Sequence, residues 1–119
     1  MHYITEIRLL ITPVLSKLSD IAAVAHTRIQ QTCKDINPVI GISRGMRAQG
    51  IPADAMTIDC LVTGKRIILI LHDQQADIIR YQFTFKDQDP TEVFEVIPIA
   101  ELTSSTLYDW MKNYFSITT

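Results

Sequence analysis

The first third of the chain repeats apolar residues at helical spacing. Leu15, Ala22 and Ile29 widen this stripe beyond a coiled-coil seam, so the pattern predicts a long helix over residues 3–34 that lies on a sheet or on a partner. Pro13 allows either one kinked helix or two segments that meet at Thr12, where Thr12-Pro13 has the pattern of an N-cap and first helical residue. The repeating positions, spaced three and four apart, are Ile4, Ile7, Ile11, Val14, Leu18, Ile21 and Ala25.

After a connector the apolar period changes to two, which is typical of β-strands. Alternation and β-branched or aromatic residues predict strands over 56–63, 66–73 and 78–87, and a fourth within the segment VFEVIPI that begins at Val93 and ends at Pro98. The strand 66–73 is apolar on both faces, so we expect it to be central. A helix or a second subunit would cover its second face through Ile68 and Ile70.

Turn lengths predict the register of these strands. A two-residue turn at Gly64-Lys65 would place Cys60 opposite Leu69. A five-residue turn over 73–77 would keep the next strand in phase, with its apolar residues on the same face. The predicted core face comprises Met56, Ile58, Cys60, Val62, Ile67, Leu69, Leu71, Ile79, Tyr81, Phe83 and Phe85.

The last segment, 103–115, has large apolar residues at helical spacing, and Thr106-x-x-Asp109 resembles a capping box. The stripe comprises Leu107, Trp110, Met111, Tyr114 and Phe115. Residues 1–119 therefore read as a single α+β domain. Its expected architecture is an antiparallel three- to four-stranded β-meander packed with a long N-terminal helix and a C-terminal amphipathic helix.

Composition narrows the class of protein. A 119-residue chain with 47% hydrophobic residues is sufficient for one core, and a net charge of −2 argues against nucleic acid as a partner. The sequence contains neither an apolar run long enough to cross a bilayer nor a secretory signal, and its two cysteines do not form a C-x-x-C pair. We expect a soluble, cytoplasmic protein with reduced thiols, no cofactor and no membrane association.

Candidate catalytic and metal-binding groups are sparse. A Cys60/His72 dyad is disfavoured because the predicted register puts the two side chains on opposite faces. Neither His26 with Cys33 nor His72 with Asp73 has the spacing of a zinc site. Two sets of carboxylates could serve acid–base chemistry, although a solvated acidic rim is the ordinary explanation of the second: Asp54 and Asp59, and Asp87, Asp89, Glu92 and Glu95.

The stretch GISRGMRAQG, residues 41–50, combines three glycines with two arginines. It lacks the lysine of a phosphate-binding loop, and a flexible connector is one interpretation. In the other, Arg44 and Arg47 bind a small anion with Ser43 and Gly45, and Arg66 or Arg80 assists. The two arginines could equally pair with the acidic region 87–101.

The sequence contains no diagnostic catalytic motif, and it offers more apolar faces than one small domain can cover. We therefore expect a protein-interaction or regulatory module without catalytic activity, acting as a homodimer or with another protein. Binding of an anionic ligand through residues 41–50 is the alternative, and an enzyme of unknown class is a weaker one. The predicted interface residues are Ile7, Ile11, Leu18, Trp110 and Tyr114.

Overall fold

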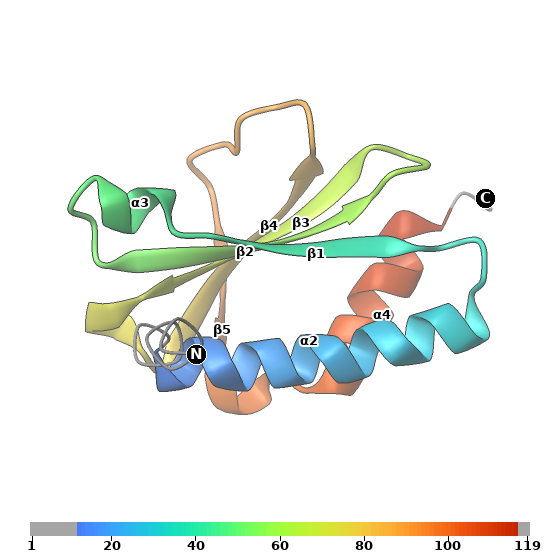
Figure 1. Ribbon diagram of the computed structural model, residues 1–119, viewed down its shortest axis with the longest axis horizontal. Helices are drawn as coiled ribbons and strands as arrows, with labels where there is room; N and C mark the ends of the chain where they lie inside the picture. Colours follow the sequence, from blue (N-terminus) through green and yellow to red (C-terminus); the bar gives the residue numbers. More distant parts are fainter. Residues whose placement is uncertain (1–11, 117–119) are drawn as a thin grey trace, which may run out of the picture.

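The computed structural model describes residues 12–116, which form two long helices and one antiparallel sheet (Figure 1). The helices are α2 (Pro13–Thr32) and α4 (Ser104–Phe115). The strands are β1 (Pro38–Ser43), β2 (Ala53–Cys60), β3 (Lys65–His72), β4 (Ile78–Phe85) and β5 (Glu95–Pro98), adjacent in chain order. Short helices α3 (Gly45–Ala48), η1 (Asp73–Gln75) and η2 (Ile99–Glu101) lie in the connections. The predicted α+β meander is confirmed, with five strands rather than three or four.

The strand absent from the prediction is β1. Its sequence, PVIGIS, contains a proline and a glycine and lies in the segment interpreted as a connector. Both residues are tolerated here because β1 is an edge strand that pairs only with β2, from Pro38 opposite Cys60 to Ser43 opposite Ala55. The stretch 41–50 thus contains the end of β1 and the single turn of α3.

The predicted length of the β2–β3 turn was wrong, but the prediction of which side chains of β2 and β3 share one face of the sheet was right. The strands are joined by four residues, 61–64, so Met56 rather than Cys60 lies opposite Leu69. Gly64 closes this turn with a φ of +74° that suits glycine. The register shift is even, so the same residues share the helix-covered face. Three of the residues predicted for the core are nevertheless exposed: Val62 lies in the turn and is 68% exposed, and Phe83 and Phe85 near the end of β4 are 41% and 39% exposed.

The predicted β3–β4 connection is confirmed. Five residues, 73–77, join the strands, and Leu69 lies opposite Tyr81. β3 is the central strand, as its two apolar faces indicated. On its second face Ile68 is buried and Ile70 is half-buried.

Each of the two long helices begins directly after a threonine whose hydroxyl caps it. Thr12 caps α2, its Oγ1 accepting from the Leu15 N–H at 3.2 Å, and Pro13 follows as the first helical residue. Any continuation through residues 3–11 lies outside the described residues. The cap of α4 is Thr103, whose Oγ1 accepts from the Thr106 N–H, so the capping box predicted at Thr106 begins three residues too late.

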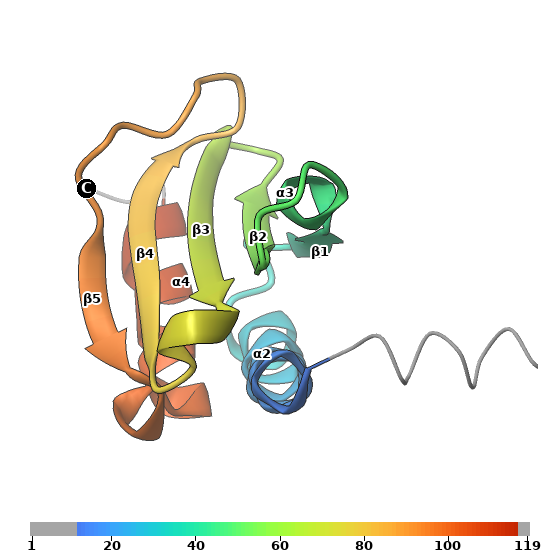
Figure 2. The same ribbon diagram turned by 90° about the vertical axis from the view of Figure 1, so that its left-hand side faces the viewer.

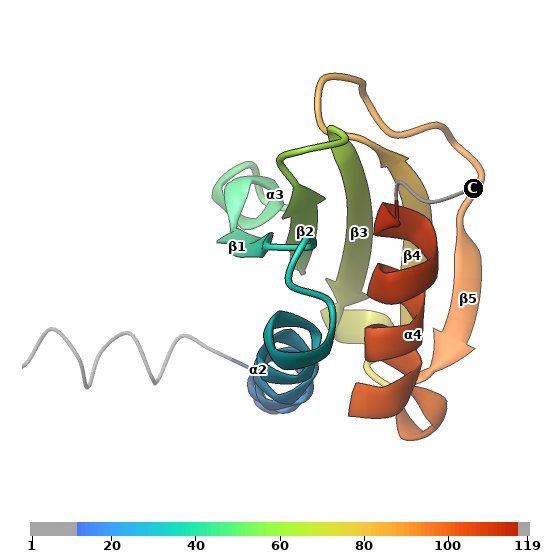
Figure 3. The ribbon, with the colours of Figure 1, turned by 90° about the vertical axis from the view of Figure 1, so that its right-hand side faces the viewer.

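Both long helices lie on the same face of the sheet, α4 against β3 and β4 and α2 beside β1 and β2 (Figures 2 and 3). The core between these layers comprises fully buried residues of both long helices and the three middle strands, including Leu18, Ile29, Ile58, Leu69, Ile79, Leu107, Met111 and Phe115. The β4–β5 loop projects beyond the sheet on the side away from α2 (Figure 2). None of the helices within residues 12–116 is long and apolar enough to cross a membrane.

Candidate functional site

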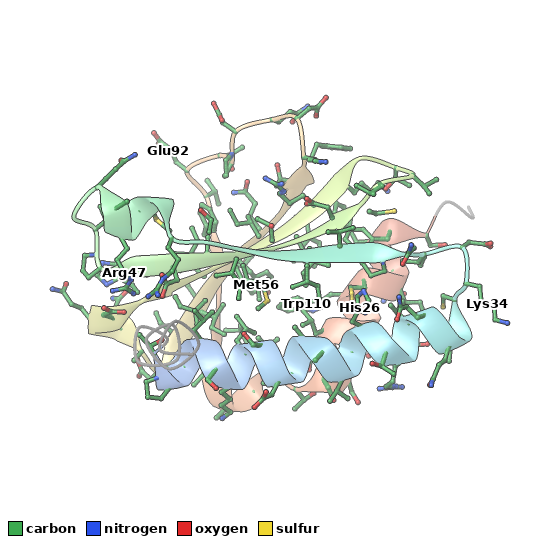
Figure 4. All side chains as sticks on the ribbon, in the orientation of Figure 1. His26, Lys34, Arg47, Met56, Glu92 and Trp110 are labelled. Carbon is green, nitrogen blue, oxygen red and sulfur yellow. The ribbon has the colours of Figure 1, made fainter. Side chains whose placement is uncertain are left out.

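The two arginines predicted to bind an anion lie beside two carboxylates of the same chain. Arg47 donates from Nε and Nη2 to Asp54 at 3.1 and 2.9 Å and from Nη1 and Nη2 to Asp73 at 2.8 and 2.9 Å. Arg44 Nε donates to Asp54 at 3.0 Å. This cluster lies at the α3 end of the molecule, where Figure 4 labels Arg47. It ties α3 to the start of β2 and to the β3–β4 turn.

The electrostatics of this cluster follow from its geometry. Burial of Asp54, only 1% exposed, raises the pKa of its carboxyl, but hydrogen bonds from Arg47 and Arg44 outweigh burial and leave the pKa below its ordinary value. A hydrogen bond from Arg47 lowers the pKa of Asp73, and the carboxylates raise the pKa of Arg47. Both carboxylates therefore stay ionised near neutral pH and neutralise the guanidinium groups that were expected to attract a ligand.

The remaining residues of the predicted anion site add little to it. Ser43 Oγ accepts from the Gly45 N–H at 3.3 Å as the chain turns from β1 into α3. Arg66 is bound by both Asp59 oxygens, at 2.6 and 2.9 Å, and this pairing raises its pKa. Arg80 donates to Gln75. The structure therefore does not bring these two arginines to the Arg44–Arg47 cluster.

The carboxylates considered for acid–base chemistry are dispersed. Asp54 and Asp59 are both buried on β2, five residues apart and so on opposite faces of the strand, and each is paired with arginine. Asp87, Asp89, Glu92 and Glu95 are all exposed in or beside the β4–β5 loop, as expected for an acidic rim.

The cysteines and histidines do not form a catalytic or metal centre within residues 12–116. Cys60 is buried at the C-terminal end of β2, whereas His72 lies opposite Ala53 at the other end, so the dyad is excluded by distance as well as by face. His26 Nε2 is 2.7 Å from the Pro38 carbonyl oxygen. No group of three metal-ligating side chains occurs in this part of the chain, and Cys33 and Cys60 are both free thiols.

The predicted interface residues divide into three cases. Ile7 and Ile11 lie outside the described residues. Leu18 is fully buried in the core between α2 and the sheet, so it is not part of an outer surface. Trp110 and Tyr114 are partly exposed and pack against the aromatic side chains of β4.

A groove that the sequence did not predict runs between α2 and the outer edge of β1. Its volume is about 620 Å³. On its strand side, Ile42 is 47% exposed and shares the α2 face of the sheet with Ile40. It is lined by Ser19, Ala22, Ala23, His26, Thr27, Asn37, Pro38, Val39, Ile40, Ile42 and Met56. The alternation in PVIGIS was its only signal in the sequence.

Comparisons with protein-family models, curated proteins and solved structures found no match for this chain. The geometry of the groove, the arginine–aspartate cluster and the aromatic surface is therefore the basis for assigning a function.

Proposed function

We propose that this protein is a non-catalytic protein-interaction module that forms a homodimer through the outer edge of β1. The observation that carries the proposal is the exposed, uncharged edge of β1 beside an apolar groove. If the dimer binds another protein, the identity of that partner would determine its regulatory role.

The two edges of the sheet differ in a way that favours β1 as the interface. Proteins commonly protect edge strands with charges, prolines or short length. β5 has four residues, including Glu95 and Pro98. β1 has six residues and no charge, and its proline is at the first position, so the rest of the strand retains its N–H groups.

The backbone of β1 is oriented for further pairing. The Pro38 carbonyl meets His26 on α2, whereas the Cys60 carbonyl, from the residue opposite Pro38, accepts from the β2–β3 turn. In an antiparallel ladder, alternate residues face opposite neighbours. Ile40 and Ile42 therefore direct their N–H and C=O groups toward the outer edge, which no strand within residues 12–116 covers.

A two-fold axis perpendicular to the sheet gives a self-complementary arrangement. With Gly41 opposite Gly41 of the second copy, Ile40 lies opposite Ile42 of that copy, and the two pairs exchange four backbone hydrogen bonds. This axis puts both α2 helices on the same side of a ten-stranded sheet. The Ile40 and Ile42 side chains share that side, so the two grooves would close over them.

The chemistry of the described residues supports a role without catalysis. The two buried carboxylates are each paired with an arginine, Asp54 with Arg47 and Asp59 with Arg66, and these pairs hold strands and turns together. The alternative predicted from the sequence, an anion at Arg44 and Arg47, would have to compete with Asp54 and Asp73 for the same donors. For this reason we favour the interaction module.

The test is an Ile42→Lys substitution. Two lysines would be buried at the symmetric interface, which should weaken dimerisation at least about 100-fold. We expect the unsubstituted chain to scatter light as a dimer, with twice its 13.5 kDa mass, and the variant as a monomer with an unchanged circular dichroism spectrum.

Val96→Lys is the matched control, because Val96 is 51% exposed on β5 at the opposite edge of the sheet. This control should remain a dimer. A strictly monomeric unsubstituted protein, or a dimer that survives Ile42→Lys, would overturn the assignment of β1.

A further inference from the structure

A second hollow lies at the other edge of the sheet, where the β4–β5 ladder ends. The last pair is Tyr81 with Glu95, and beyond it the chain leading into β5 separates from β4. A hollow of about 390 Å³ opens at this point, with Trp110 of α4 beside it. It is lined by Tyr81, Gln82, Phe83, Val93, Glu95 and Trp110.

Three aromatic rings form the apolar part of this hollow. Tyr81 stacks on Trp110 with ring centroids 4.3 Å apart, and Phe83 meets Trp110 edge-on at 5.6 Å. Phe83 is 41% exposed, so part of its ring is open to solvent. The exposed π-surface is therefore held rigidly by contacts among the rings themselves.

The opposite rim is held by the Gln82 side chain. Its Nε2 donates to the Thr91 and Val93 carbonyls at 3.2 and 2.7 Å, and its Oε1 accepts from the Thr91 N–H at 2.9 Å. The amide takes the place of the missing ladder bonds and fixes Val93 at the edge of the hollow. The site is thus preformed rather than dependent on closure of a loop.

The charge around the hollow is negative. Glu95 lines it directly, and the segment 86–95 contains four carboxylates and one lysine, a net charge of −3. None of the residues that line the hollow is basic. Figure 4 labels Glu92, which lies in the acidic β4–β5 loop above the sheet. Aromatic faces beside a carboxylate attract a cation, and a guanidinium can both stack on a ring and pair with a carboxylate.

We propose that this hollow binds an arginine side chain from an exposed basic segment of a partner protein. The volume suits one long side chain, whose aliphatic stem would pack on Phe83 and whose guanidinium would meet Glu95. The acidic residues are spread along a loop rather than gathered at one point, which favours an extended segment with several positive charges over a small amine. The inference rests on the proposed role in protein binding, but it concerns the edge opposite β1.

Trp110 provides the measurement, since it is the only tryptophan in the chain. The probe is acetyl-Gly-Arg-Gly-Arg-Gly-amide, followed by Trp110 fluorescence and by the indole N–H signal in NMR. We expect saturable binding at low salt that weakens as salt is added. The lysine counterpart should bind less tightly, and the uncharged citrulline counterpart should not bind.

Two variants test the chemistry. Glu95→Gln keeps the shape and should weaken binding about tenfold, while Phe83→Leu removes the ring and should weaken it about threefold. Glu101→Gln is the matched control, because it makes the same change of charge at an exposed position in η2 outside the hollow. This control should bind as the unsubstituted chain does.

Equal weakening by Glu95→Gln and Glu101→Gln would show general attraction to an acidic surface and overturn the site. Absence of a Trp110 response to millimolar peptide would also overturn it. Choline binding as tightly as the peptide would show a small-cation site and overturn the partner assignment. Repeating the titration with Ile42→Lys separates the two proposals, since that variant leaves the hollow unchanged.

Discussion

At the scale of single residues, the outcome for Arg44 and Arg47 shows how partners distant in sequence change an interpretation. Their immediate neighbours are neutral, which made them candidates for binding an external anion. The fold instead brings Arg47 to Asp73, 26 positions away, and to the buried Asp54. A buried carboxylate needs charged hydrogen-bond donors, so this arrangement makes the two arginines structural.

Arg47→Ala should therefore destabilise the protein. The substitution removes the donors that Arg47 gives Asp54 while Arg44 remains, so we expect a loss of about 2 kcal/mol in the free energy of unfolding, measured with urea. Arg80→Ala, a half-buried arginine bound to Gln75, should cost about 0.5 kcal/mol. If Arg47→Ala were neutral in stability but abolished stabilisation by added phosphate, Arg47 would be a ligand-binding residue.

The same cluster predicts acid sensitivity. Asp54 and Asp73 have folded-state pKa values below the ordinary 3.8, so in the interval below 3.8 the unfolded chain binds more protons than the folded one. Their contribution is complete above that pH and is lost as the pH falls through the lower folded values. Melting temperatures measured from about pH 6 to about pH 3 should fall most steeply below about pH 4. Asp54→Asn should flatten this fall, and an equally steep profile would assign the acid sensitivity to other groups.

At the scale of elements, local signals located one helix cap and missed another: the pattern at Thr12-Pro13 matches a cap, whereas the cap of α4 is Thr103 rather than Thr106. The hydroxyl and proline of Thr12-Pro13 cap the start of α2 in the structure, which was one of the two alternatives that the sequence left open. The residues that share one face of each strand were also predictable, because side chains alternate with a period of two along a strand. Turn length was harder to predict. Gly64 was placed first in a two-residue turn, but it is the last residue of a four-residue turn.

Thr12→Ala tests the helix start. Loss of the cap should cost about 1 kcal/mol, measured by urea unfolding. Thr27→Ala in the same helix is the control, because Thr27 is exposed and its Oγ1 only donates back to the Ala23 carbonyl at 3.1 Å. Alanine favours a helix more than threonine does, so the control should be neutral or slightly stabilising. Equal losses at both positions would mean that the Thr12 hydroxyl does not stabilise the helix.

At the scale of the whole molecule, the sheet has two unlike edges. One, at β1, is uncharged and lies beside an apolar groove; the other, at β4 and β5, combines aromatic rings with carboxylates. A molecule with this asymmetry can pair with itself at one edge and leave the other free for a different partner. The two long helices, α2 and α4, lie on one face of the sheet, and within residues 12–116 no further strand pairs with β1 or β5 (Figure 3).

The proposed dimer predicts that thermal stability depends on protein concentration. Only the folded chain pairs, so a tenfold rise in concentration should raise the melting temperature by about 3 °C. Ile42→Lys should show a melting temperature that is constant across the same range. A constant value for the unsubstituted chain would argue against dimerisation coupled to folding.

The sequence by itself determined the features that depend on neighbouring residues. These include the apolar face of α2, the alternating faces of β2 to β4, the five-residue turn before β4 and the capping signal at Thr12-Pro13, because side-chain periodicity and capping act within a few positions of the chain. Tertiary structure alone decided that β1 pairs with β2, that Arg47 meets Asp54 and Asp73, and that Glu95 lies beside Phe83 and Trp110. These contacts join residues whose separation in sequence has no periodic signature, and the pairing order of the strands together with the packing of α3 and α4 brings them together.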